Sequence, residues 1–326
     1  MTFERIAAAA IAAAILSGAG GAAAQSSTTG AVTVYTAGPK NLADALAKGF
    51  TAKTHARVNL FQATTGKIMA RLAAEQANPQ CDVLISAAWE TAVAMKAKGQ
   101  LLAYESPNAA KVPAMLKDGS YVAQGAAALA IIWNGKTGKP KPRDWSDLAM
   151  VSYKDAVTMP DPAASGSAFG LVSGLAADQN FGWKFFQTLK SNGAFVAGAN
   201  AGALNPVMQG AKAAVFGGVD YISLGARAKG ESIDVIYPAS GTVLEARPMM
   251  ILKSTKNAAL AKRFIDYALS DDGQKLVANV YLLPARTDVA AKRPGWKDIK
   301  LLPAEAAGAP SRADTLTHFK TVMGLK

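Results

Sequence analysis

The chain is long for a single hydrophobic core, and it is strongly basic. It has 326 residues, of which 50% are hydrophobic, and a formal net charge of +12. Chains of this length usually divide into more than one domain, so two lobes are expected. Lys and Arg are scattered through the sequence and aromatic residues make up only 7%, which argues against a nucleic-acid partner. A positive field that attracts small anionic solutes explains the charge better.

The amino terminus predicts export. An apolar run at residues 6–14 follows Arg5, and the alanines at 22–24 fit the small-residue rule for signal cleavage. Residues 1–24 are therefore interpreted as a secretory signal peptide, cleaved near Ala24–Gln25, and the mature protein is expected in the periplasm. The apolar run is shorter than the roughly 20 residues that a membrane span requires.

From residue 31 the sequence alternates between strand, loop and helix patterns. Strands are expected at residues 32–35, 57–61 and 82–86. Each is followed by a segment with a helical apolar period, and βα units in a row imply a parallel sheet with helices on both faces. Ligands of such sheets bind beyond the carboxyl ends of the strands. Thr36, Thr65 and Ser86 lie at that edge and are candidate ligand residues, although a threonine there also serves as an ordinary helix cap.

Two long apolar segments are predicted to carry the chain between the lobes. The first covers residues 122–133, and residues 243–252 are interpreted as the return crossing. Two crossings imply a hinge of two strands. Between them a second α/β series runs through strands expected at 156–159, 213–216 and 233–237. The predicted division is 25–125 plus 250–326 for lobe I and 126–249 for lobe II.

The stretch at 159–170 reads as a strand that stops and a helix whose first turn is open. Its two prolines prevent further ladder pairing, and the apolar spacing that follows predicts a helix beginning between Ser165 and Ser167. The first N–H groups of a helix lack intrahelical partners and carry partial positive charge. Ser165, Gly166, Ser167 and Ala168 are therefore candidates for holding a phosphate-like group. The alternative is that one serine simply caps the helix.

Asp220 is the acidic residue in the most suggestive position. It follows a glycine pair at the end of the strand at 213–216 and precedes Tyr221. There it could carry negative charge into the cleft between the lobes and pair with a cation, or it could cap the next helix. Asn200, at the start of a helix predicted over 200–209, is a further candidate ligand residue.

Catalytic and metal-binding signatures are absent from the sequence. There is no Gly-x-Ser-x-Gly elbow and no complete P-loop. The two histidines, His55 and His318, are expected at the surface and are too few for a His-rich metal site. The single cysteine, Cys81, excludes an internal disulfide framework and is expected to be a small buried thiol. Neither an enzyme activity, nor a metal, nor a cofactor is expected.

Several motifs together resemble a known family. They are Val-Tyr-Thr-Ala in the first strand, Thr-Thr-Gly-Lys followed by Ala-Arg-Leu, Asn-Pro-x-x-Asp-Val, Pro-Asp-Pro-x-x-Ser-Gly-Ser-Ala, Gly-Val-Asp-Tyr and Leu-Pro-Ala-Arg-Thr-Asp-Val. In this order they look like family 1 extracellular solute-binding proteins of ABC importers, in the branch of ferric-iron and 2-aminoethylphosphonate binders. The resemblance implies a type II periplasmic binding fold of two α/β lobes, each with a mainly parallel sheet. It also implies a monomer that hands its ligand to an inner-membrane permease.

The resemblance also separates the two ligand classes of that branch. Ferric-binding members use a histidine in the first loop and two adjacent tyrosines, whereas this chain has Gly38-Pro39 in the loop and Val219-Asp220 before Tyr221. Fe(III) prefers several anionic oxygens, so the match implies a phosphonate-like member in which Asp220 faces an amine. The alternatives are a ferric-iron or other cation binder, a thiamine or polyamine binder, and an exported phosphoester hydrolase. The predicted ligand residues are Thr36, Thr65, Ser86, Ser165, Gly166, Ser167, Ala168, Asn200, Asp220 and Tyr221.

Overall fold

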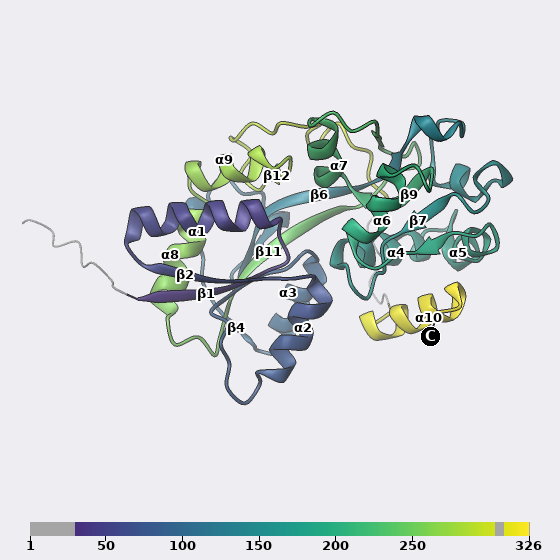
Figure 1. Ribbon diagram of the computed structural model, residues 1–326. Coiled ribbons are helices and arrows are strands. Elements are labelled where there is room, and N and C mark those ends of the chain that lie inside the picture. The colour runs from purple at the N-terminus through teal and green to yellow at the C-terminus, as the bar shows by residue number, and fades with distance from the viewer. Residues whose placement is uncertain (1–29, 304–309, 326) are drawn as a thin grey trace, which may run out of the picture.

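The computed structural model describes residues 30–303 and 310–325, and in it the chain forms two lobes side by side (Figure 1). The predicted signal peptide lies outside the described residues. Two strands, β6 (Tyr121–Trp133) and β11 (Leu244–Leu252), run from one lobe into the other. No helix among the described residues is long and apolar enough to cross a membrane.

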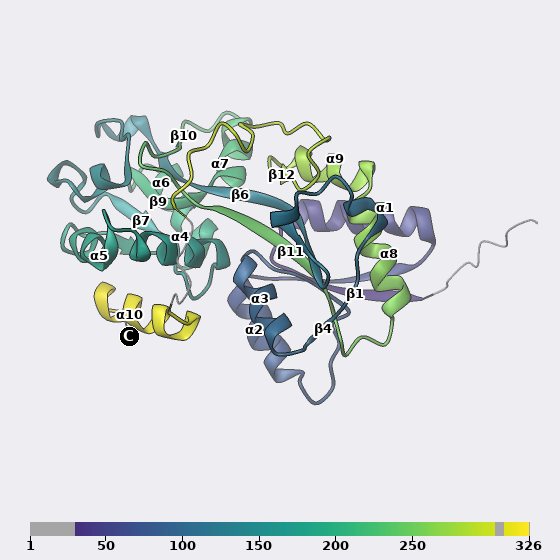
Figure 2. The ribbon, with the colours of Figure 1, turned by 180° about the vertical axis from the view of Figure 1, so that it is seen from behind.

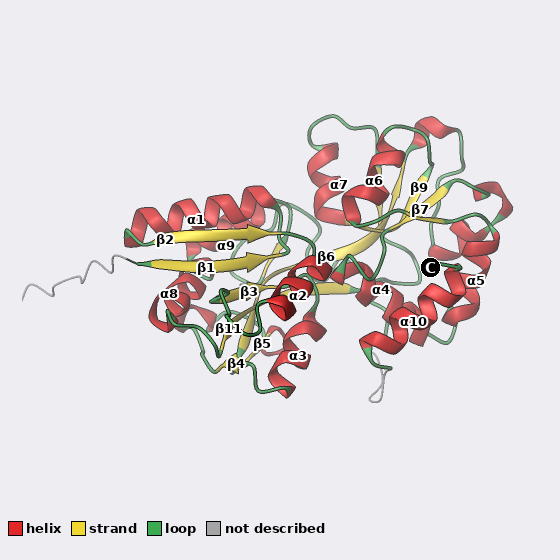
Figure 3. Cartoon of the chain, turned by 60° about the horizontal axis from the view of Figure 1, so that its bottom comes forward, coloured by secondary structure: helices red, strands yellow, loops and turns green. Residues whose placement is uncertain are grey.

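The first lobe is built on the predicted parallel sheet. Its strands are β1 (Ala31–Thr36), β2 (Arg57–Gln62) and β3 (Val83–Ile85), with the short β4 (Leu101–Leu102), β5 (Lys117–Asp118) and β12 (Leu283–Pro284) at its margins. Its helices are α1 (Lys40–Thr54), α2 (Thr65–Ala74), α3 (Trp89–Ala97), α8 (Ala258–Ala268) and α9 (Asp271–Asn279). β1 pairs in parallel with both β2 and β3, as the repeating βα pattern predicts. Figure 3 shows helices on both faces of this sheet.

The second lobe repeats the arrangement on a smaller scale. Its strands are β7 (Val157–Met159), β8 (Phe195–Val196), β9 (Ala214–Val219) and β10 (Asp234–Ile236). Its helices are α4 (Gly166–Ala177), α5 (Gly182–Ser191), α6 (Asn200–Met208) and α7 (Asp220–Arg227). β7 pairs in parallel with β8 and β9. The fold class predicted from the sequence, two mainly parallel α/β lobes, is confirmed.

The crossing strands join the two sheets into one continuous structure. β6 pairs antiparallel with β11 in a register that runs from Leu244 opposite Ala128 to Met250 opposite Tyr121. Farther along, β6 pairs antiparallel with β9 of the second lobe. The register shifts between Ala246 and Pro248, where one residue of β11, Arg247, faces two residues of β6, Gln124 and Gly125. A bulge of this kind bends a strand and redirects a side chain.

The C-terminal segment returns to the second lobe, which differs from the predicted assignment of residues 250–326 to lobe I. Leu301 forms an isolated bridge with Thr242, and helix α10 (Arg312–Met323) lies against α5, below the second lobe in Figure 1 and seen from behind in Figure 2. Phe319 of α10 packs on the ring of Phe186, with the centroids 6.1 Å apart. The reason is apolar burial, since the inner face of α10 covers aromatic residues of α5.

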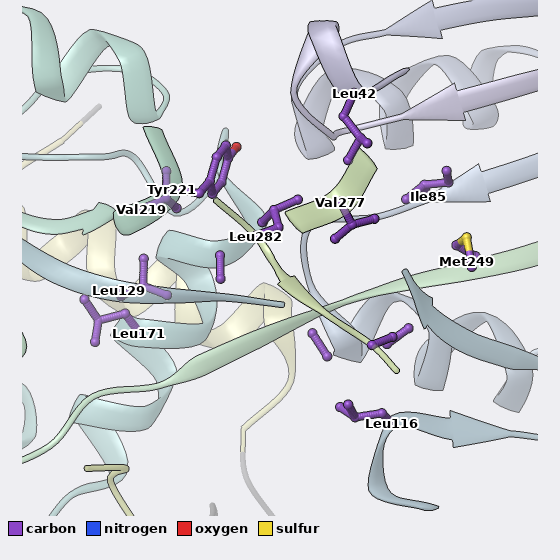
Figure 4. Packing of buried hydrophobic residues seen from close by; sticks show 14 of the residues in the cluster. Leu42, Ile85, Leu116, Leu129, Leu171, Val219, Tyr221, Met249, Val277 and Leu282 are labelled. Atoms are coloured by element: carbon purple, nitrogen blue, oxygen red, sulfur yellow. The ribbon is translucent and has the colours of Figure 1, made fainter. Parts of the chain in front are cut away.

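The hydrophobic core is continuous between the lobes. Figure 4 shows Leu42 and Ile85 of the first lobe and Leu129 and Val219 of the second lobe in one cluster, with Leu282 between them. These side chains are 2% exposed or less. The crossing is therefore a packed element, and relative movement of the lobes has to bend its strands rather than separate two independent cores.

Gly125 tests how tightly the crossing is packed. It lies in β6, and a Cβ at this position would meet the carbonyl oxygen of Leu283 at 2.5 Å and Cγ1 of Val277 at 2.8 Å. Overpacking of this kind typically costs about 1–3 kcal/mol, so Gly125→Ala is expected to lower the free energy of unfolding by that amount in urea titrations. Gly119→Ala is the matched control, because a Cβ there meets nothing within 4 Å. Equal stability of the two variants would contradict this packing.

Candidate ligand-binding cleft

A cavity of about 450 Å³ lies between the lobes, and we call it the interlobe cavity. Its walls are made by the beginnings of six helices, three from each lobe: α1, α2 and α3 from the first, and α4, α6 and α7 from the second. One lining residue represents each of these starts: Pro39, Thr65, Ala87, Gly166, Asn200 and Tyr221. The carboxyl ends of the strands face the cavity, as expected for ligand sites in open α/β sheets.

The two lobes touch at one side of this cavity. The N–H of Gly66, in the first turn of α2, donates to the carbonyl of Ala164 across the cleft at 3.5 Å. A Cβ added to Gly166 would lie 2.8 Å from Cβ of Ala88 and 2.9 Å from Oγ1 of Thr65. Position 166 is thus glycine because the two backbones approach closely here, and the lobes are in contact in this structure.

Thr65 carries a buried hydroxyl that has no partner. The residue is 4% exposed and lines the cavity, and its Oγ1 makes no hydrogen bond to the described residues. Leaving a buried hydroxyl unpaired costs about 1–3 kcal/mol. This atom lies beside Gly166, where α4 begins, so the orphaned hydroxyl from one lobe faces the open helix start of the other.

Ser165 is the N-cap of α4, as the alternative interpretation of this stretch held. Its Oγ accepts from the N–H of Ala168 at 3.2 Å and donates to Oδ1 of Asn200 at 2.9 Å. The hydroxyl of Ser167 lies 3.2 Å from Oγ of Ser165 and is fully buried. The serines therefore brace the helix start, while the N–H groups of the first turn lack intrahelical partners.

The electrostatic character of the interlobe cavity is positive. Among its described lining residues Lys67 carries a charge and no carboxylate is present. Each helix start adds partial positive charge, which favours anions. The N-cap of α6 is Ala199, which offers no side-chain acceptor, so the first N–H groups of that helix also remain available to a ligand.

Arg247 is a cationic residue near the cavity that the predictions missed. It lies where the register between β11 and β6 shifts, is 1% exposed, and donates from Nη2 to the carbonyl oxygen of Ala37 at 2.5 Å. Its guanidinium carbon is 5.9 Å from the ring centroid of Tyr221, and its Nε has no partner among the described residues. Burial lowers the pKa of Arg247, and the charge of Glu245 acts in the opposite direction. Both Ala37 and Tyr221 line the cavity, so this charge lies directly behind its wall.

Asp220 lies outside the cavity lining and has protein partners. Its carboxylate is fully buried and forms an ion pair with Arg293, accepts from the N–H of Ala128 at 3.0 Å, and accepts from the hydroxyl of Tyr237 at 3.2 Å. Burial raises the pKa of Asp220, and the neighbouring guanidinium opposes that rise. The positive charge predicted to meet Asp220 is therefore supplied by Arg293, from the segment that follows β12.

The structure places the remaining predicted residues in two groups. Thr65, Ser165, Gly166, Asn200 and Tyr221 line the interlobe cavity. Four others lie behind it without lining it: Thr36, Ser86, Ser167 and Ala168. Oγ1 of Thr36 accepts from the N–H of Gly38 at 3.0 Å, and Oγ of Ser86 donates to Oγ1 of Thr91 at 3.0 Å, so both hydroxyls hold their own loops.

Metal-binding groups do not gather in the described part of the chain, where no three His, Cys, Asp or Glu side chains form a cluster that could hold an ion. His55 and His318 are exposed, as predicted, and His318 stacks on the ring of Trp183 with the centroids 4.3 Å apart. Cys81 is the buried thiol that was expected, and burial raises its pKa.

An ion pair joins the lobes beside the cavity. Arg312, at the start of α10, stacks over the ring of Phe169 at 4.1 Å and donates to the carbonyl of Pro162 at 3.2 Å, both in the second lobe. Its Nη1 also reaches Oε1 of Glu90, in α3 of the first lobe, at 2.6 Å. Burial raises the pKa of Glu90, which the charge of Arg312 opposes. The pair therefore forms across the cleft when the lobes are together.

Comparison with known proteins is consistent with this architecture. Residues 78–305 match the model of the family described as bacterial extracellular solute-binding protein. The chain belongs to this family. A Salmonella typhimurium relative named "Putative 2-aminoethylphosphonate-binding periplasmic protein" is 25% identical over 258 residues, covering 76% of this chain and 75% of the relative. An uncharacterised protein of Haemophilus influenzae is 27% identical over 264 residues, with the same coverage of both chains.

Solved structures share the fold of this solute-binding protein at low sequence identity. The periplasmic binding protein AfuA from Actinobacillus pleuropneumoniae, with fructose-6-phosphate bound, superposes with a TM-score of 0.82 at 21% identity, covering 91% of this chain and 99% of AfuA. Iron-bound HitA from Pseudomonas aeruginosa gives a TM-score of 0.76 at 20% identity, covering 90% of this chain and 99% of HitA. Both are two-lobed type II periplasmic binding proteins. Family and fold are those of the substrate-binding components of transporters.

The ion pair between Asp220 and Arg293 is expected to contribute to the stability of the fold. Asp220→Ala leaves the guanidinium of Arg293, whose side chain is fully buried, without its carboxylate. Removing one partner of a buried pair typically costs about 3–5 kcal/mol, so the free energy of unfolding in urea is expected to fall by that amount. Asp44→Ala is the control, since Asp44 pairs with Lys40 at the surface and should matter little. An Asp220→Ala protein as stable as the control would contradict the structural role.

The ion pair between Glu90 and Arg312 is expected to hold the two lobes together. Glu90→Gln keeps the shape of the side chain but removes its charge, so the contact across the cleft weakens and the separated arrangement of the lobes gains population. Small-angle X-ray scattering of the unliganded protein is expected to show a larger radius of gyration. Asp118→Asn is the control, because Asp118 pairs with Lys96 within the first lobe at 2.7 Å. Identical scattering from the Glu90→Gln protein and the wild type would show that the pair does not hold the lobes together.

Proposed function

We propose that this protein is the periplasmic solute-binding component of an ABC importer and that it captures a small phosphonate or phosphate ester in the interlobe cavity. The unpartnered hydroxyl of Thr65 opposite the open start of α4 supports this proposal most directly. Closure of the lobes around the ligand would present the liganded shape to a membrane permease.

A phosphorus anion suits the donors around the cavity. Phosphate groups bind at helix starts because several N–H groups and the helix dipole point at the same place. Here the starts of α2 and α4 face one another from opposite lobes, and a tetrahedral group with three oxygens can accept from both. Lys67 in the lining and Arg247 behind it add positive charge without a carboxylate in the described lining to cancel it.

One candidate ligand is 2-aminoethylphosphonate, which appears in the names of several relatives. Its phosphonate end fits the cavity as described above. Its ammonium end was predicted to pair with Asp220, whose carboxylate is instead engaged by Arg293. The proposal for this chain therefore rests on the phosphonate group, and the ammonium group is the part that the binding experiment has to test.

The rival ligands make different chemical demands. Ferric iron requires several anionic oxygens, and thiamine or a polyamine requires carboxylates for its cationic groups. The described lining of the cavity contains no carboxylate, and Tyr221 is the one tyrosine in it. A phosphoester hydrolase would need a general base or a metal at the bound phosphorus.

Isothermal titration calorimetry of the mature protein tests the proposed function. The panel is methylphosphonate, 2-aminoethylphosphonate, inorganic phosphate, ferric citrate, thiamine and spermidine. Heat of binding is expected with the phosphorus compounds, and none with thiamine or spermidine. Binding of ferric citrate alone, with a coloured complex, would replace the proposal by an iron-transport function. Release of phosphate from a model ester would replace it by an enzyme.

Thr65→Val tests the observation that supports the proposal. Valine fills the same volume without the hydroxyl, so the protein loses a donor to the anion but no internal hydrogen bond. A hydrogen bond to a charged group contributes about 1.5–3 kcal/mol, which corresponds to about 10- to 150-fold weaker phosphonate binding. The thermal unfolding temperature is expected to stay the same or rise.

Thr91→Val is the matched control for this variant. Oγ1 of Thr91 is also buried, but it accepts from Ser86 at 3.0 Å and lies outside the cavity lining. That variant should lose stability without a selective loss of phosphonate affinity. If Thr65→Val bound phosphonate as tightly as the wild type, the hydroxyl would have no role in binding.

A further inference from the structure

A second cavity of about 720 Å³ opens directly beside the interlobe cavity, and we call it the second compartment. Four residues line both spaces: Pro39, Ala201, Tyr221 and Ile222. The lining residues of the second compartment come from α6 and α7 of the second lobe and from the end of α9 and the start of α1 in the first lobe. Figure 1 shows where these helices lie. The two cavities therefore share part of their walls, and a ligand anchored at the helix starts lies next to the larger space.

The walls of the second compartment differ in chemistry from those of the interlobe cavity. Apolar and aromatic side chains form much of its surface: Leu204, Met208, Ile222, Val280 and Tyr281. Uncharged amides at Asn41, Asn205 and Asn279 supply polar groups. The charged residues in the lining, Lys229 and Glu231, are of opposite sign and exposed. Such a surface favours an uncharged organic group over an ion, because apolar contact is gained without desolvating a charge.

Tyr281 marks the wall that the first lobe contributes. It follows α9 with a left-handed backbone (φ 61°), an uncommon conformation for a non-glycine residue. Its carbonyl accepts from Nη1 of Arg293 at 3.4 Å, and its ring lies against Gly225, where an added Cβ would be 3.8 Å from Cδ2. Arg293 therefore ties this aromatic residue of one lobe to Asp220 of the other. The second compartment is accordingly bounded by residues held in defined positions.

The structure points to a ligand with two different ends. We infer that this protein binds an organophosphate or organophosphonate whose organic part is uncharged, larger than an aminoethyl group, and seated in the second compartment. The inference rests on the proposed function, because the anionic head has to occupy the interlobe cavity. It follows from the shared lining, from the apolar and amide walls of the second compartment, and from the engagement of Asp220 by Arg293.

Calorimetry on a series with different organic groups tests this inference. The ligands are methylphosphonate, 2-aminoethylphosphonate, phenylphosphonate and glycerol 3-phosphate. Burial of an organic group of this size is expected to make phenylphosphonate or glycerol 3-phosphate bind at least about tenfold more tightly than methylphosphonate. 2-Aminoethylphosphonate should gain little over methylphosphonate.

Variants that fill the second compartment with a large side chain test the same inference. Ala228→Trp places a large ring in its lining, outside the lining of the interlobe cavity, at an exposed position at the end of α7. It is expected to abolish the gain from the larger organic groups while methylphosphonate still binds as in the wild type. Asn205→Trp, from α6, is a second filling variant in case the first one is unstable. Ala97→Trp, at the exposed end of α3, is the control and should leave the whole series unchanged.

The outcomes separate this inference from the proposed function. Tightest binding of 2-aminoethylphosphonate would overturn the inference and leave the proposed function standing, as would equal affinities across the series. The inference would also be wrong if both filling variants folded and kept the gain. If no phosphorus compound bound the wild-type protein, the proposed function would fail, and the inference with it.

Discussion

The structure depends on one constraint of α/β architecture: a strand that ends at the cleft is followed by a helix that begins there. Six helices start at the interlobe cavity, three from each lobe, and their first N–H groups have no partners within the helix. A single open helix start exposed to water is a weak anion site. Several starts facing one volume, with Thr65 unpartnered beside Gly166, leave polar groups unpaired around the cavity, and the proposed anionic ligand would satisfy them.

The charges buried near the crossing strands support this site without lining it. Arg247 lies at the register shift between β11 and β6 and donates to the carbonyl of Ala37, so one side chain positions both the wall of the cavity and the positive charge behind it. Asp220 and Arg293 neutralise each other outside the lining of the cavity. Arg247 adds positive charge near the cavity, and the pair of Asp220 and Arg293 adds no net charge. The electrostatic potential in the cavity therefore stays positive, which suits the proposed anionic ligand.

Much of the fold was predictable because it is encoded locally. The alternation of β-prone runs with helical apolar periods placed the strands and helices close to where they are, and two long apolar runs identified the crossing strands. The position of α10 was not predictable, because its packing on α5 depends on aromatic contacts between segments more than 100 residues apart. The helix start at Ser165 could be read from two prolines and an apolar period, which are features of the local sequence.

The partners of individual side chains were harder to predict. Asp220 follows a glycine pair at a strand end, a position typical of a ligand residue, but its partner Arg293 lies 73 residues away in a loop without a pattern. Arg247 did leave a signal. An arginine before a proline inside a buried apolar strand is unusual, since such a strand normally excludes charge. That contradiction between residue and environment is what marks a position with a special role.

Closure links these local features to ligand affinity. A ligand that contacts both lobes binds fully only when they are together, so its apparent affinity falls with the population of the closed arrangement. The contacts between Gly66 and Ala164 and between Arg312 and Glu90 join the two lobes and stabilise that arrangement. Thr65 acts in the opposite direction, because its hydroxyl is unpaired when the lobes meet without a ligand. The unliganded closed form therefore carries a cost that the proposed anionic ligand would remove, and such a difference would allow the ligand to select the closed state.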